Sequence, residues 1–186
     1  MASITYFPQA GPKNTEEVLQ IARTRAQELG IRAILVATTG GVTGARAVEV
    51  LRGHQVIAVT HAHGWRTPNA QELTEENRAK IIAGGGIILT ATHPMGALGR
   101  AVRRHFNTYE TEEIIANTFR ILGQGMKVTC EITVMAADAG LVRTDEEVIS
   151  IGGTRRGADT AIVVRPANAQ DFFDLRVKEI LCKPRF

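Results

Sequence analysis

The sequence predicts one α/β domain, residues 1–186, with a mainly parallel sheet covered by helices on both faces. Short apolar runs of strand length alternate with amphipathic segments of helical length, which is typical of such sheets. The length of 186 residues corresponds to one domain, and 44% hydrophobic with 22% charged residues is ordinary for a globular protein. No repeat, linker or low-complexity stretch divides the chain.

The N-terminal half predicts four strands joined by helices. Residues 4–7 form a short first strand, and 33–37 are a continuous apolar run typical of a strand buried on both faces. Between them, Asn14 and Glu17 have the spacing of a capping pair, and Gly30 stands where a helix ends. The other expected elements are a short helix closed by Gly53, a strand over 56–59, a helix from a Thr74 cap to about Ala83 and a strand over 87–89.

The C-terminal half begins with two expected helices, over about 96–106 and 111–122. Residues 126–139 fit both strand alternation and helical spacing, and their Ala-rich ending before Gly140 favours a helix. Two strands follow over 148–151 and 161–164, and residues 175–182 predict a last edge strand. These closing strands are expected to form an antiparallel edge of the sheet.

Composition and chain ends exclude several classes of protein. The 22 Lys and Arg residues against 19 acidic ones leave a net charge of +3, which does not by itself indicate nucleic-acid binding. The N-terminus lacks the basic and apolar regions of a signal peptide, and no apolar run is long enough to span a membrane. Cys130 and Cys182 fit neither a disulfide framework nor a zinc site. We therefore expect reduced thiols in a cytoplasmic protein.

Three of the predicted buried strands end alike, in Thr, then Thr or His, then glycine shortly after. The carboxyl ends of parallel strands lie along one edge of the sheet, and ligands bind there. The pattern therefore predicts a shared site at that edge. The alternative interpretation is that threonine and glycine simply end strands and open turns. The polar residues gathered by this pattern are Thr38, Thr39, Thr60, His61, His63, Thr92 and His93.

The loop over 38–44 joins a buried strand to a helix and is rich in glycine, at Gly40, Gly41 and Gly44, with a hydroxyl at Thr43. Glycine allows close backbone approach, and the free N–H groups of a helix start suit a phosphate. The loop lacks the Walker A pattern and the GxGxxG fingerprint, which disfavours an NTPase or an NAD enzyme. A plain structural turn is the alternative.

A second candidate loop lies between the two closing strands and carries adjacent arginines. Arginine makes bidentate contacts to anions, so this loop is expected to help hold a phosphorylated ligand if it folds over the same edge. The alternative is a solvated loop between neighbouring strands. The candidate residues here are Gly153, Thr154, Arg155, Arg156, Gly157, Asp159 and Thr160.

Other polar clusters are less specific. His61 and His63 could share a metal ion with His93, which is distant along the chain. No further ligand and no carboxylate stands close to His61 and His63 in the sequence. Arg100, Arg103 and Arg104 form one basic helix face, which favours a solvated surface or a subunit contact over nucleic acid because aromatic residues are only 5%. Glu131 and Asp138 are expected on a solvated helix face rather than in the crevice.

The residues over 33–43 and 56–60 resemble the effector-binding loop and next strand of the pyruvate kinase C-terminal domain. The stretches 148–153 and 157–160 look like that domain's closing glycine-rich hairpin. The likeness to stand-alone proteins of this kind covers nearly the whole chain. It implies a three-layer α/β/α sandwich and no pyruvate kinase activity, because the catalytic barrel is a separate domain. Gly40 and Val42 depart from the Ser and Arg of the kinase loop, which weakens sugar-bisphosphate binding as an inherited role.

The resemblance to the stand-alone group also implies bound flavin mononucleotide (FMN). Residues 39–44 would then take the ribityl phosphate, and His61, His63 or His93 could donate protons in a flavin-dependent oxidoreductase. A non-catalytic sensor or regulatory module for a phosphorylated metabolite is the alternative. A metal-assisted hydrolase built on the three histidines is a third hypothesis. A small α/β protein of this kind is often a symmetric oligomer, so a homo-oligomer is a further expectation.

Overall fold

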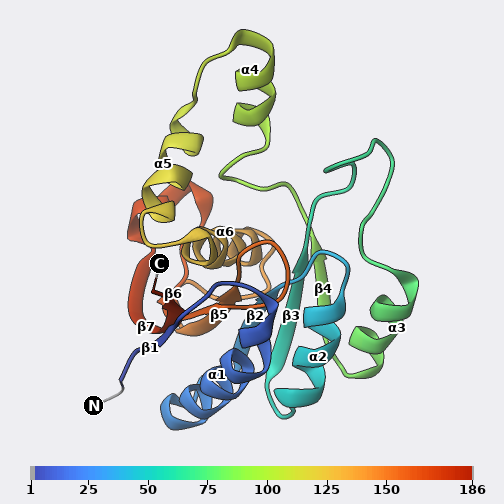
Figure 1. The fold of residues 1–186 in the computed structure, drawn as a ribbon, viewed down its shortest axis with the longest axis vertical. Coiled ribbons are helices and arrows are strands. Elements are labelled where there is room, and N and C mark those ends of the chain that lie inside the picture. The colour runs from blue at the N-terminus through green and yellow to red at the C-terminus, as the bar shows by residue number, and fades with distance from the viewer. Residues whose placement is uncertain (1–2, 186) are drawn as a thin grey trace.

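The computed structural model describes residues 3–185, in which seven strands form one sheet with helices on both faces (Figure 1). The strands are β1 (Thr5–Phe7), β2 (Ala33–Ala37), β3 (Gln55–Thr60), β4 (Ile87–Thr90), β5 (Val148–Gly152), β6 (Thr160–Arg165) and β7 (Arg176–Pro184). Their order across the sheet is β1-β7-β6-β5-β2-β3-β4. The α/β class predicted from the alternating pattern is confirmed.

The sheet is parallel around β2 and antiparallel around β6. Strand β2 pairs in parallel with β3 and β5, and β4 extends this part in parallel with β3. Strand β6 runs antiparallel to β5 and β7, which confirms the antiparallel C-terminal part of the sheet. The last strand is not outermost, because β1 pairs in parallel with β7 and covers its free side.

The helices divide between the two faces. They are α1 (Thr15–Leu29), α2 (Val42–Val50), α3 (Glu75–Ala83), α4 (Leu98–Phe106), α5 (Thr111–Arg120) and α6 (Gln124–Asp138), with short 3-10 turns at Pro12–Asn14 and Ala169–Asp174. One face of the sheet is covered by α1, α2 and α3, which contribute Leu19, Leu51 (directly after α2) and Ile81 to the core. Cys130 of α6 and Ala116 of α5 pack on the other, so the described residues form a three-layer sandwich.

The ambiguous stretch 126–139 is helical, as its ending predicted. Most residues of α6 are buried, on every side of the helix. A helix surrounded by protein has no polar face, so its sequence loses the 3.6-residue period and resembles a strand. The buried cysteine of this helix, Cys130, is a free thiol, as is Cys182 in β7. Burial raises the pKa of each to about 12, which keeps both protonated.

Of the helix caps expected at Asn14, Gly30 and Thr74, the last two are present. The Thr74 hydroxyl accepts a hydrogen bond from Asn77 N at 3.3 Å, and Gly30 ends α1 in the left-handed region at φ 66°. The prediction that the Asn14 side chain caps α1 is wrong. The 3-10 turn before α1 already gives Asn14 helical dihedrals, and its amide instead donates to the carbonyl of Gln9 at 2.8 Å.

Helices α4 and α5 form an arm in which α5 packs against α6 and α4 stands away from the sandwich (Figure 1). Helix α4 packs chiefly against α5, whose inner side carries the buried Glu113 and Ala116. Within residues 3–185, none of the helices combines the length and the apolar character needed to cross a membrane. The arm matters for the site, because α4 begins close to the carboxyl ends of β3 and β4.

Candidate functional site

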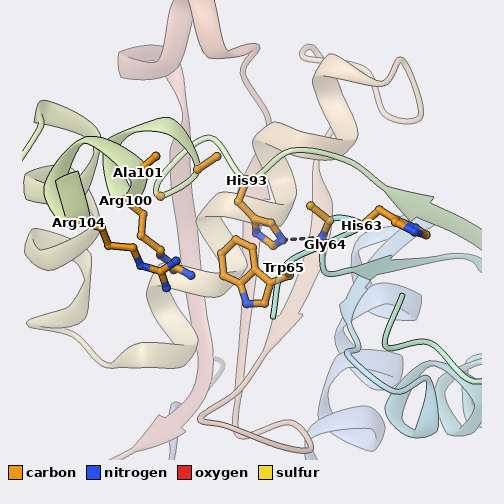
Figure 2. A pocket seen from close by; sticks show the side chains of 10 residues that line it. His63, Gly64, Trp65, His93, Arg100, Ala101 and Arg104 are labelled. Carbon is orange, nitrogen blue, oxygen red and sulfur yellow. Dashed lines mark hydrogen bonds between the residues drawn. The ribbon is translucent and has the colours of Figure 1, made fainter. Parts of the chain in front are cut away.

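A cleft of about 200 Å³ opens between the arm and the loops that follow β3 and β4 (Figure 2). One wall comes from residues 62–65 after β3, and the other from α4 and the turn before it. His93, in the loop after β4, is buried at the back. The residues lining this cleft are Ala62, His63, Gly64, Trp65, His93, Gly96, Ala97, Arg100, Ala101 and Arg104.

Trp65 lines the cleft and contacts the side chains of Arg100, His93 and His61. The guanidinium carbon of Arg100 lies 4.1 Å from the centroid of the indole ring, within the range of a cation–π contact. The ring centroids of His93 and His61 lie 4.4 Å and 5.0 Å from that of Trp65. The indole is half-buried. It therefore presents a flat aromatic surface beside a positive charge.

The positive charge of the cleft comes from Arg100 and Arg104, one helical turn apart on α4. Burial lowers the pKa of Arg100, and the neighbouring charges of Arg104 and Arg103 lower it further. Arg103 is neutralised by Glu113, whose carboxylate accepts from its Nε at 2.9 Å. Within residues 3–185, neither Arg100 nor Arg104 has a carboxylate within 4.0 Å. Two unpaired cations in one cleft favour an anionic ligand.

His93 joins the back of the cleft to helix α6. Its Nε2 atom accepts a hydrogen bond from Ala62 N at 3.3 Å, drawn as the dashed line in Figure 2. An imidazole nitrogen that accepts must be unprotonated, so the ring proton of neutral His93 lies on Nδ1. That atom is buried without a well-directed hydrogen bond, and the nearest acceptor is Glu131 Oε2 at 3.4 Å. The contact between the Glu131 carboxylate and Nδ1 therefore orients the imidazole ring of His93.

Glu131 lies at the centre of a buried charged group behind the cleft. One of its oxygens accepts from Met95 N at 3.1 Å, and the other forms an ion pair with Lys127 one turn earlier on α6. Burial alone would raise the pKa of Glu131, but His93 and Lys127 together lower it to about 2. Burial lowers the pKa of Lys127, against the pull of Glu131. The pair fixes the turn that leads from β4 into α4.

His61 has a separate carboxylate partner at the mouth of the cleft. Its Nδ1 lies 2.6 Å from Glu72 Oε2, and the other oxygen of Glu72 lies 3.1 Å from Arg66 Nε. Burial lowers the pKa of His61, although Glu72 opposes this effect. Below these rings, the hydroxyl of Thr60 lies 2.6 Å from that of Thr90. The histidines predicted from the strand ends therefore do meet here: His63 lines the cleft with His93, and His61 contacts Trp65 at its edge.

The glycine-rich loop over 38–44 does not line this cleft. The Thr38 hydroxyl accepts from Gly44 N at 3.2 Å, and the Gly40 carbonyl accepts from Asn77 Nδ2 at 2.8 Å. Gly41 has φ 95°, and a Cβ at this position would overlap Asn77. Residues 73–77 thus pack over part of the predicted phosphate loop. Thr39 and Gly40 remain half-buried, Thr43 is buried, and Thr92 of the later strand end is exposed.

The second candidate loop follows β5, at the same edge of the sheet but separated from β3 by β2. Its Asp159 is buried and accepts hydrogen bonds from Gly11 N at 3.0 Å, Thr154 N at 3.0 Å and the Thr160 hydroxyl at 2.8 Å. Asp159 therefore ties this loop to the N-terminal segment. Gly153 packs within the loop and Gly157 against Pro12. Arg155 and Arg156 are exposed and do not reach the cleft.

Several cleft residues were missed from the sequence. Arg100 and Arg104 were expected on a solvated face or a subunit contact, and Trp65 carried no motif. Glu131 is buried rather than solvated, because α6 is covered on all sides, whereas Asp138 is exposed as expected and accepts from Ala169 N at 2.9 Å. In residues 3–185 no group of three His, Cys, Asp or Glu side chains is arranged to hold a metal ion. The sequence signal that could have indicated the cleft was the pair Arg100 and Arg104, spaced i, i+4 soon after a predicted strand end.

Comparison with known proteins gives one family. Residues 16–164 match the family described as pyruvate kinase, alpha/beta domain. Among solved structures, a pyruvate kinase from Cryptosporidium parvum is 14% identical, with 82% of this chain and 23% of the kinase covered and a TM-score of 0.43. A second structure of that organism's pyruvate kinase is 13% identical, covering 82% and 22%, with a TM-score of 0.41. A third, in complex with ADP, is 14% identical, covering 82% and 24%, with a TM-score of 0.43.

This chain therefore spans 22–24% of the length of those kinases. The family match covers most of the chain, and it agrees with the resemblance carried by the strand-end loop and the closing hairpin. The chain belongs to the pyruvate kinase α/β domain family.

Proposed function

We propose that this chain binds a phosphorylated small molecule with a planar ring in the cleft beside Trp65, and that FMN is that ligand. The observation that carries the proposal is the pairing of a half-buried indole that lines the cleft with two cations that lack carboxylate partners, Arg100 and Arg104. Arginine suits bidentate contact with phosphate, and an indole suits stacking with an aromatic ring. These two chemistries recur together in nucleotide-like ligands.

The donor set of the cleft fits both ends of FMN. Arg100 and Arg104 would hold the phosphate, and Trp65 would contact the ring. The cavity of about 200 Å³ is smaller than the roughly 300–1,000 Å³ typical of sites that enclose a whole ligand. Part of the molecule would therefore lie along the exposed His63 and Gly64 at the mouth. When bound, FMN would supply electron transfer for an oxidoreductase.

The histidines of the cleft are suited to hold protons at defined atoms. Neutral His93 carries its proton on Nδ1, and Glu131 lies next to this atom. Nδ1 of His61 lies within hydrogen-bond distance of Glu72, and burial favours the neutral form of this histidine. His63 is the exposed member of the set. In the proposed oxidoreductase, these residues are the candidates for exchanging a proton with the ligand or with water.

The test uses Trp65, which is the only tryptophan of the chain. Adding FMN to the purified protein should quench its emission with saturation, and dialysis against FMN should give one flavin per chain. Arg100→Ala and Arg104→Ala should each weaken binding by about tenfold or more, as expected for loss of a charge-assisted contact. Arg32→Ala removes an equal charge from an exposed site outside the cleft and should leave the affinity unchanged.

The same titration separates the cleft from the two sequence-predicted loops. The double variant Arg155→Ala/Arg156→Ala should bind FMN as the wild type does, because these side chains lie outside the cleft. Loss of binding in that variant, with binding kept in Arg100→Ala, would move the site to the loop after β5. No saturable quenching by FMN would end the flavin proposal. A turnover assay with reduced nicotinamide and bound FMN then distinguishes an oxidoreductase from a binding module.

A further inference from the structure

The wall of the cleft that follows β3 is an exposed loop bound at its start to His93. Residues 62–70, which we call the cleft loop, are exposed from position 63 onward except for the half-buried Trp65. Ala62 N donates a hydrogen bond to His93 Nε2 at 3.3 Å (Figure 2). The carbonyl of the same Ala62 accepts from Trp65 N at 3.2 Å. A change at His93 therefore reaches Trp65 through one residue.

The two ends of the cleft loop are joined to each other without His93. The carbonyl of His61, just before the loop, accepts from Gln71 Nε2, just after it, at 3.1 Å. Nδ1 of His61 lies 2.6 Å from Glu72 Oε2. These contacts do not involve Ala62. If Ala62 separates from His93, the ends of the loop stay in place and the movement is confined to the cleft loop.

His93 accepts the hydrogen bond from Ala62 only when its ring is neutral. A neutral imidazole has one accepting nitrogen, whereas both nitrogens donate in the imidazolium form. A proton on Nε2 would face the N–H of Ala62, and this hydrogen bond would break. The bound form therefore holds one proton fewer than the separated form, so a fall in pH favours separation. Histidine is the side chain that ordinarily changes charge between pH 5 and 8.

The groups around His93 act on its charge in opposite directions. The carboxylate of Glu131 lies 3.4 Å from Nδ1 and stabilises an imidazolium. Lys127, which pairs with Glu131, and the His61 ring, 5.6 Å away between centroids, oppose a further positive charge. His93 is only 6% exposed, so these neighbours have more influence than solvent. The other titratable or charged groups that line the same cleft are His63, Arg100 and Arg104.

We propose that His93 is a pH-sensitive switch of the cleft loop: neutral His93 binds Ala62 and keeps Trp65 in the cleft, and protonated His93 releases both. The ring contact of 4.4 Å between His93 and Trp65 places the indole next to the group that changes charge. The switch belongs to the protein without ligand. If the proposed function is correct, the released loop would also move Trp65 away from the ligand.

The experiment follows the ligand-free protein from pH 8 to pH 5. Nitrogen-15 NMR of His93 should show an unprotonated Nε2 at pH 8 that gains a proton as pH falls. Protection of the Ala62 amide from hydrogen exchange, corrected for the intrinsic effect of pH, should fall about tenfold at the same midpoint, as expected for the loss of one hydrogen bond. Acrylamide quenching of Trp65 should rise with it. Far-UV circular dichroism should stay constant.

The matched variant is His93→Gln, because the glutamine amide oxygen accepts a hydrogen bond at every pH in this range. This substitution should remove the pH dependence of both Ala62 exchange and Trp65 quenching. The controls are His61→Gln and His63→Gln, which remove the other two histidines near the cleft. Both controls should keep the pH dependence of the wild type.

Three results would overturn the inference. The first is a His93 ring that carries its proton on Nε2 at pH 8 or gains none by pH 5. The second is protonation of His93 with unchanged Ala62 protection or unchanged Trp65 quenching. The third is a response that persists in His93→Gln or disappears in either control. The first two need only the wild type, so they remain decisive if a variant fails to fold. Failure of FMN to bind would leave the switch standing.

Discussion

The guanidinium of Arg100 lies 4.1 Å from the centroid of the Trp65 ring, and this contact joins the α4–α5 arm to the loop after β3. Arg100 contributes a charge without a carboxylate partner, and Trp65 contributes a flat apolar surface.

Replacing Arg100 should expose Trp65 even without ligand. In Arg100→Ala the ring loses the group that covers one of its faces, so acrylamide should quench its fluorescence more strongly and its emission should move to longer wavelength. Arg104→Ala removes the same charge one turn later without uncovering the ring, and its quenching should match the wild type. Equal quenching in all three proteins would show that Arg100 does not cover Trp65 in solution.

Breaking the buried pair behind His93 should destabilise the protein strongly. Glu131→Gln leaves the Lys127 ammonium buried without its counter-charge, and such losses cost about 3–5 kcal/mol of unfolding free energy. Lys127→Met added to Glu131→Gln should recover much of this loss, because no buried charge then remains. Urea unfolding measures both. Glu76→Gln breaks the exposed pair with Lys80 at the same spacing and should change stability by less than about 0.5 kcal/mol.

Glu131 should also make stability depend on pH in the acid range. Its pKa is about 2 in the folded protein against an ordinary value of 4.5, so the unfolded chain binds the proton more readily. The resulting stabilisation is fully present above pH 4.5 and is lost as pH falls from 4.5 towards 2. Unfolding free energies measured across this window should fall more steeply in the wild type than in Glu131→Gln. Parallel curves for the two proteins would contradict the assigned pKa.

Gly125 should tolerate no side chain. A Cβ at this position would overlap the Thr160 side chain, because the first turn of α6 packs directly on β6. Gly125→Ala should therefore lower the unfolding free energy by about 1–3 kcal/mol, as overpacking of a core does. Gly40→Ala is the control, since the nearest atom to its Cβ would be Glu72 O at 3.8 Å. An unchanged denaturation midpoint for Gly125→Ala would show that this contact is looser than described.

Much of the fold was predictable because local patterns and packing agree. The apolar run over 33–37 predicted a central strand, and β2 does pair on both sides. Gly30 and Thr74 predicted helix ends from backbone and side-chain chemistry alone. Asn14 failed because a preceding 3-10 turn changed its dihedrals. The outer position of β1 could not be foreseen, since pairing with β7 joins opposite ends of the chain.

The candidate site was predictable only in part. The strand-end rule brought His61, His63 and His93 together, since parallel strands share an edge. It did not separate this cleft from the loop over 38–44, which residues 73–77 partly cover. Nor did it reach Trp65 and Arg100. Their contact depends on where the arm lies, and no spacing along the chain records that.

The sequence by itself determined the α/β class, the order of the elements and the edge of the sheet where polar residues gather. Periodicity, glycine and capping residues act over a few positions, so they can be recognised in one dimension. Only the tertiary structure decided that Glu131 is buried beside His93, that Arg100 of α4 lies over Trp65, and that Trp65 also contacts His93. These relations come from packing between segments about 30 or more residues apart, where burial and charge, rather than local propensity, select the arrangement.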